Sequence, residues 1–146
     1  EYAGQQGLEL TYHIHTNLMV DSVDDWKLYM ANLKKAKLCI DVSHADLWGY
    51  DAVESLSDFR SQLNYVHLQD YSDCTGREPS NYNPSWVAVG EARCLDFEGC
   101  AQILKDTNYD RWVTSCPGAP PEAGEDAVSE AKRSAKMYEY CRATGF

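Results

Sequence analysis

Short apolar runs alternate with segments of helical spacing along the whole chain, and this alternation constrains the fold more than any other feature. The strand-like runs lie at residues 7–15, 38–42, 65–68 and 112–116. The segments with helical character follow them at residues 22–35, about 51–63, 96–104 and 125–143. Strands that alternate with helices predict a parallel sheet with right-handed crossovers. We therefore expect an α/β fold with a single unit over 1–146, made of four βα units at about 7–36, 37–63, 64–108 and 109–146.

Two architectures fit this order of elements. One is an open, doubly wound sheet of four strands. The other is half of a (β/α)8 barrel, a fold that usually needs ~250 residues, whereas this chain has 146. Neither GxGxxG nor GxxxxGK[ST] follows the first strand, so the usual signatures of nucleotide binding are missing.

Charge and composition exclude several classes of partner. The chain has 13 Lys and Arg against 23 Asp and Glu, a formal net charge of −10, which argues against nucleic acid or an anionic membrane as partner. No run approaches the roughly 18 apolar residues of a membrane span, and residues 1–4 lack the character of a signal peptide. The six cysteines form no CxxC pair. We therefore expect reduced cysteines and a cytoplasmic protein.

Polar side chains recur where the four predicted strands end. They are His13, His15, Asp41, His44, His67, Asp70 and Cys116. The carboxyl ends of parallel strands meet at one edge of a sheet, where ligands bind. Imidazole and carboxylate groups together suit a divalent metal such as manganese, cobalt or zinc. The sequence predicts a shared polar site at this edge, against the competing interpretation that each histidine is structural.

Loop residues on the same side of the sheet are candidates for substrate contacts. Trp48 and Trp86 fall in loops where they could stack on a sugar ring, although tryptophans are core residues by default. The segment 70–90 is long and rich in Asn, Pro and Ser, and such loops are usually functional or mobile. We expect this segment to be the most mobile part of the chain and to lie over the site.

Four motifs carry a resemblance to a known family. They are LCIDVSHA at 38–45, YVHLQD at 65–70, VGEARCLDF at 89–97 and YDRW at 109–112. In order and spacing they resemble the xylose isomerase-like TIM barrels, the sugar phosphate isomerase/epimerase superfamily, and the YHIH run at 12–15 is most similar to its inosose dehydratase branch. The resemblance implies that the four units correspond to strands 5 to 8 of a barrel. The missing half would then come from the same parent chain or from a homo-oligomer partner.

The resemblance also implies a site and an activity. Asp41 and His67 match the family's metal ligands, while His13 and Cys116 stand where it often has glutamates, and the cofactor is a divalent ion (Mn, Co, Mg or Zn). The implied catalytic residues are His13, His15 and Asp70, and the implied contacts to a carbohydrate substrate are His44, Trp48, Trp86, Glu91 and Arg93. The implied function is a metal-dependent isomerase, epimerase or dehydratase acting on a sugar, ketose or inositol-like compound. Because Cys116 replaces a carboxylate, the alternative is a non-catalytic half-barrel that binds a carbohydrate or a partner chain.

Overall fold

A four-stranded parallel sheet forms the centre of the computed structural model, which describes residues 2–16, 18–20, 22–73, 85–92, 94–116 and 126–146. Its strands are β1 (Thr11–His13), β2 (Lys37–Asp41), β3 (Leu63–Leu68) and β6 (Trp112–Ser115). They lie side by side in the order β1-β2-β3-β6, and every neighbouring pair is parallel. The predicted α/β fold class and the predicted order of strands are confirmed.

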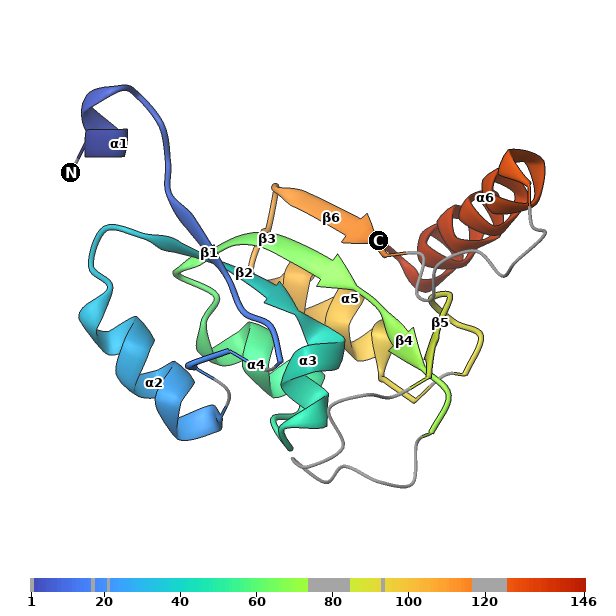
Figure 1. The fold of residues 1–146 in the computed structure, drawn as a ribbon, viewed down its shortest axis with the longest axis horizontal. Helices are drawn as coiled ribbons and strands as arrows, with labels where there is room; N and C mark the ends of the chain where they lie inside the picture. Colours follow the sequence, from blue (N-terminus) through green and yellow to red (C-terminus); the bar gives the residue numbers. More distant parts are fainter. Residues whose placement is uncertain (1, 17, 21, 74–84, 93, 117–125) are drawn as a thin grey trace.

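Most of the helices lie on one side of this sheet, whereas the short first helix lies apart from it. The helices are α1 (Tyr2–Gln5), α2 (Val23–Asn32), α3 (Val42–Leu47), α4 (Ala52–Asp58), α5 (Phe97–Asp106) and α6 (Ala127–Thr144). Helices α2 to α5 lie below the sheet in Figure 1, and α6 packs against β6 and α5. A doubly wound sheet carries helices on both faces, so the arrangement matches the wall of a barrel instead. No helix in the described part of the chain is both long and apolar enough to cross a membrane.

Polar side chains start the helices where the sequence indicates. Each cap accepts a hydrogen bond from the backbone N–H three residues later, which satisfies one free donor of the first turn. These caps are Ser22 for α2, Asp51 for α4, Asp96 for α5 and Asp126 for α6. Helix α6 ends at Gly145, whose φ of 112° is left-handed and suits glycine. The Asp51 cap agrees with the expected helical segment that begins at about residue 51.

Several element boundaries differ from the sequence-based expectation. Val42, expected to end the second strand, is the first residue of the unpredicted helix α3. The helix begins there because the Asp41 side chain accepts the backbone N–H of Ser43 at 3.0 Å and so caps it directly at the strand end. Leu63, expected on a helix, opens β3, and β1 covers three residues of the expected run at 7–15.

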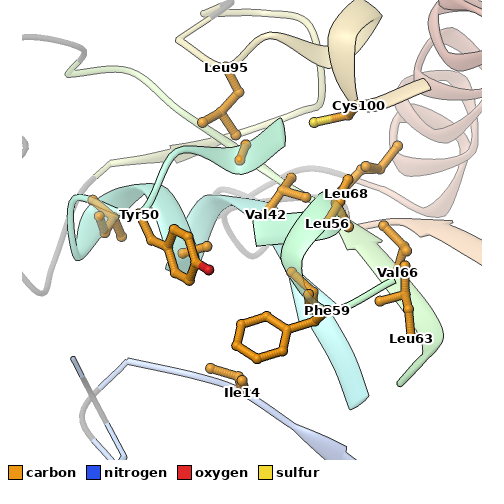
Figure 2. Packing of buried hydrophobic residues seen from close by; sticks show 14 of the residues in the cluster. Ile14, Val42, Tyr50, Leu56, Phe59, Leu63, Val66, Leu68, Leu95 and Cys100 are labelled. Carbon is orange, nitrogen blue, oxygen red and sulfur yellow. The ribbon is translucent and has the colours of Figure 1, made fainter. Parts of the chain in front are cut away.

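The hydrophobic core fills the space between the sheet and its helices. Successive strand side chains point to opposite faces, and the core face carries Leu38, Ile40, Val66 and Leu68, each fully buried. Figure 2 shows Val66 and Leu68 near Leu56 of α4 in this layer. The alternate positions, among them Cys39, Asp41, Tyr65 and His67, therefore project from the face that no described helix covers.

The third βα connection contains a small antiparallel pair. Strand β4 (Asp70–Tyr71) pairs with β5 (Trp86–Val87), and Ser72 donates its N–H to the Ser85 carbonyl at 2.9 Å. Residues 74–84, on which most of the expected mobile segment at 70–90 falls, lie outside the described residues.

The described cysteines include both free thiols and one disulfide-bonded residue. Cys39, Cys100, Cys116 and Cys141 are free, as expected. Cys94 is disulfide-bonded, which corrects the expectation of fully reduced cysteines. Disulfides persist mainly in oxidising compartments, so the cytoplasmic location stays a prediction that Cys94 does not support.

Candidate metal and catalytic site

All four histidines of the chain meet at the carboxyl edge of the sheet. The ring centroids of His13 and His67 are 4.6 Å apart, those of His13 and His15 are 5.8 Å apart, and those of His15 and His44 are 3.9 Å apart. Asp41 is the direct register partner of His67 on the neighbouring strand. The shared polar edge predicted from the strand ends is therefore present.

Asp41, His67 and Cys116 form one potential metal-binding set. One ligand atom from each lies within 4.8 Å of the other two. Cys116 extends β6, because its N–H donates to the Leu68 carbonyl of β3 at 2.7 Å. The set combines carboxylate oxygen, imidazole nitrogen and thiol sulfur, which are all ligands of first-row divalent metals.

Hydrogen bonds from the first turn of α3 hold the Asp41 side chain in place. The backbone N–H and the hydroxyl of Ser43 donate to Oδ1 of Asp41, at 3.0 and 2.5 Å. Burial raises the pKa of Asp41, against the lowering effect of these hydrogen bonds and of His67 and His13. The other oxygen, Oδ2, accepts no hydrogen bond from any described residue and lies 3.9 Å from His44 Nε2. Sequence reasoning missed the contact by which Ser43 positions Asp41. A serine two residues after an aspartate that caps a helix is the sequence pattern that could have indicated it.

Burial favours the neutral form of two of these imidazoles, His13 and His44. Burial, followed by repulsion from His67, lowers the pKa of His13. The pKa of His44 is lowered to about 3. Burial is the largest cause, and electrostatic repulsion from His15, His13 and His67 adds to it. His15 contacts the Thr16 carbonyl through Nδ1 at 2.9 Å. Because a carbonyl only accepts, Nδ1 carries a proton there, and Nε2 of the neutral ring keeps its lone pair.

The donor atoms fit a divalent cation. Burial raises the pKa of Cys39 and of Cys116 to about 12 in each case, so without a cation both are neutral thiols. His44 is 2% exposed, and its Nδ1 has no hydrogen-bond partner among the described residues. A bound cation reverses the effect of burial on thiols and carboxyls, because it stabilises their charged forms. A second set, His13, Cys39 and His67, also has its ligand atoms within 4.8 Å. Sequence reasoning missed Cys39, although strand alternation places it on the face of Asp41.

Two further predicted residues lie beside the cluster. The ring centroid of Trp86 is 5.1 Å from that of His44, so this tryptophan of β5 borders the imidazoles. Asp70 is fully buried, and its carboxylate accepts the backbone N–H groups of Tyr71, Gly90 and Ala92 at 2.9 to 3.2 Å. These contacts make Asp70 the anchor of the loop at 88–92. Its proposed catalytic role stays a prediction, in which it acts through that loop.

The remaining predicted contacts gain no support from their positions. Trp48 is 5% exposed and packs in the core, with its ring centroid 5.2 Å from that of Trp26, so packing accounts for it. Glu91 is exposed, and its carboxylate accepts the Ala88 N–H at 3.1 Å. Arg93 lies outside the described residues. Substrate contacts by these three residues stay predictions.

Comparison with known proteins agrees with the fold described above. The profile of a family described as "Xylose isomerase-like TIM barrel" matches residues 1–140. An inosose dehydratase of Geobacillus kaustophilus is 27% identical over 143 residues, which cover 90% of this chain and 44% of that protein. The chain therefore spans less than half the length of this relative.

Solved structures show the same fold. The xylose isomerase domain protein of Planctomyces limnophilus aligns with a TM-score of 0.73 and 18% identity, over 98% of this chain and 49% of that one. The D-psicose 3-epimerase of Clostridium cellulolyticum H10 aligns with a TM-score of 0.69 and 12% identity, over 97% and 51%. The sheet is thus a TIM-barrel fragment of four strands. By the match over 140 residues, the chain belongs to the xylose isomerase-like TIM barrel family.

Proposed function

We propose that this chain carries the metal-binding edge of an enzyme that acts on a polyhydroxylated carbonyl compound, and that the reaction is a dehydration of an inosose-like ketone. The observation that carries the proposal is the convergence of Asp41 with all four histidines on one sheet edge. The inosose dehydratase relative supports the substrate class. Isomerisation and epimerisation of a ketose are the neighbouring alternatives, because they begin with the same proton removal.

Asp41 and His67 would hold the cation, with Cys116 beside them. A bound divalent cation would polarise the substrate carbonyl and so acidify the adjacent carbon. His15, through Nε2 of its neutral ring, would accept the proton from that carbon, with His13 beside it. Dehydration then needs a proton on the departing hydroxyl, which the protonated imidazole supplies. The C–H and C–O bonds break, a C=C bond forms, and water leaves.

The residue types favour dehydration over epimerisation. Epimerisation through two opposed carboxylates needs a second acid at the last strand, and Cys116 stands there. Burial raises the pKa of Cys116 to about 12, so without a cation the thiol stays neutral near pH 7. A dehydration that uses one imidazole as base and then as acid needs no second carboxylate.

Solvent deuterium exchange tests the first chemical step. The chain is loaded with Mn²⁺ and incubated in D₂O with an inosose, and NMR follows deuterium entry next to the carbonyl. Calorimetry measures Mn²⁺ binding in parallel. We expect one bound ion and measurable exchange, both lost in Asp41→Ala and His67→Ala, and both kept in Asp110→Ala, whose side chain is 92% exposed.

Two results would contradict the proposal. A chain that binds no cation under any loading condition supports the non-catalytic, carbohydrate- or partner-binding alternative. If the chain binds Mn²⁺ but incorporates no deuterium into an inosose, D-psicose or D-tagatose, the catalytic assignment is wrong as well.

A further inference from the structure

A second group of metal-ligating atoms takes its sulfur from Cys39, which lies two residues nearer the amino end of β2 than Asp41. It consists of His13, Cys39 and His67, and one ligand atom from each lies within 4.8 Å of the other two. His13 and Cys39 are register partners on β1 and β2. The His67 ring centroid lies 4.6 Å from that of His13. All three ligands therefore stand on strands of one sheet, which is a rigid support for a site.

We propose that His13, Cys39 and His67 bind a thiophilic divalent cation, zinc in preference to manganese or magnesium, at a position distinct from the one framed by Asp41 and Cys116. Two imidazoles and one thiolate suit tetrahedral zinc and leave a fourth position for water or a substrate oxygen. Manganese and magnesium prefer oxygen ligands. When zinc binds, the S–H bond of Cys39 breaks, its proton passes to solvent, and a zinc–sulfur bond forms.

The three side chains are available for this role. Within the described part of the chain, neither the Cys39 sulfur nor the ring nitrogens of His13 and His67 make a hydrogen bond. Cys39 is 4% exposed, so its sulfur faces little competing water. Ligand atoms around tetrahedral zinc lie about 3.5 Å apart, given bonds of about 2.0–2.3 Å. The three ligand atoms lie within 4.8 Å of one another, so side-chain rotations have to shorten each separation by at most about 1.3 Å.

His67 belongs to both sets, so an ion on the Cys39 side competes with one on the Asp41 side. If the proposed function holds, zinc on the Cys39 side displaces the cation that serves it. The zinc site itself does not depend on that function, because it rests on ligand geometry alone.

Cobalt(II) is the probe, because it replaces zinc and its bond to a thiolate gives a charge-transfer absorption band. The purified, metal-free chain is titrated under anaerobic conditions without added thiol. We expect one equivalent of cobalt to produce the band and zinc to displace it. Cys39→Ser should abolish the band and weaken zinc binding at least tenfold. Cys116→Ser and Asp41→Asn should keep the band, as should Cys141→Ser, which changes a free cysteine on α6.

Other outcomes overturn the proposal. A band lost in Cys116→Ser and kept in Cys39→Ser assigns the sulfur ligand to Cys116. No band in the unmodified chain shows that no thiolate binds the ion. Circular dichroism checks the fold of each variant, and His13→Gln, at an exposed position, tests the site without altering the core. It should weaken cobalt binding at least tenfold, and unchanged affinity counts against the site. Mn²⁺ binding and deuterium exchange report on the proposed function separately.

Discussion

Burial and crowding by other imidazoles disfavour a proton on His44 and on His13. His44 is 2% exposed and packs against His15 and Trp86, so a proton on its ring would be desolvated and repelled by three other histidines. His13 experiences the same two effects more weakly, at a more exposed position. Neutral rings are the form that ligates metal and accepts protons. Burial of His44 and His13 thus favours this form, and it lowers the stability of the folded chain in acid.

The lowered pKa of His44 makes the free energy of unfolding depend on pH. The pKa of His44 lies near 3 when folded and near 6.5 when unfolded, so the unfolded chain binds the proton more tightly. Its contribution to stability is fully present above about pH 6.5 and is lost as the pH falls toward 3. Urea unfolding with a chelator present should show a loss on the order of 1–2 kcal/mol between pH 7 and pH 5. His44→Asn should flatten this slope, and equal slopes for both proteins would refute the assignment.

We expect Cys116 to influence which ion binds at Asp41 and His67. Its thiol lies within 4.8 Å of ligand atoms of Asp41 and His67, at the position where the family resemblance implies a glutamate. Cys116→Glu supplies an oxygen ligand, which manganese prefers to sulfur. We expect calorimetry to show manganese binding tightened about tenfold, with Cys116→Ser as the control that removes sulfur without adding a charge. Unchanged manganese affinity in the glutamate variant would make Cys116 a packing residue.

At the scale of elements, Gly90 joins the site loop to the last helix. Its N–H donates to the anchoring carboxylate of Asp70 at 3.2 Å, and its φ is 87°. A Cβ added there would lie 2.7 Å from ring atoms of Tyr140 on α6, closer than packing permits. The loop at 88–92 is thereby fixed between β4 and α6, which positions the neighbouring strand β5 and its Trp86.

Gly90→Ala should therefore be costly. The left-handed φ costs about 1–2 kcal/mol for alanine, and the clash with Tyr140 adds about 1 kcal/mol or more. Urea unfolding should show a loss of about 2 kcal/mol or more. Gly49→Ala is the matched control, because Gly49 has a φ of 81° and an added Cβ there would meet nothing within 4 Å. If both variants lose the same stability, the Tyr140 contact does not hold the loop.

The sequence predicts elements whose pattern is local and fails where tertiary contacts decide. The apolar runs that become β2 and β3 and the polar residues Ser22 and Asp96 that precede helical spacing are local signals, and the structure confirms the strands and helices that they indicate. Helix α3 has no amphipathic pattern because all six of its residues are buried, so only the Asp41 cap reveals it. In the same way, the polar residues at the strand ends predict a shared polar edge from local sequence alone. The position of Cys39 beside His13 depends on the strand register, and the contact of Ser43 with Asp41 depends on where α3 begins.

At the scale of the whole molecule, one sheet face and two sheet edges are left without a covering element among the described residues. Strands β1 and β6 are the outer strands of the sheet, and neither has a second strand neighbour among the described residues. Trp112 opens β6 opposite Tyr65, on the face away from the helices, and is 74% exposed. Relatives of this chain are about twice as long. We propose that further sheet, from the same parent chain or from a second copy, covers this face.

In the absence of a longer chain, a second copy is the available cover. We expect the 146-residue chain to self-associate at micromolar concentration in analytical ultracentrifugation. Trp112→Lys should weaken this association tenfold or more, because burying a large aromatic side chain contributes about 2–3 kcal/mol and an edge lysine opposes strand pairing. Leu28→Lys, at a 67% exposed position on α2, is the control and should leave association unchanged. A monomer at all concentrations, or equal effects of both lysines, would show that Trp112 and the open face do not mediate assembly.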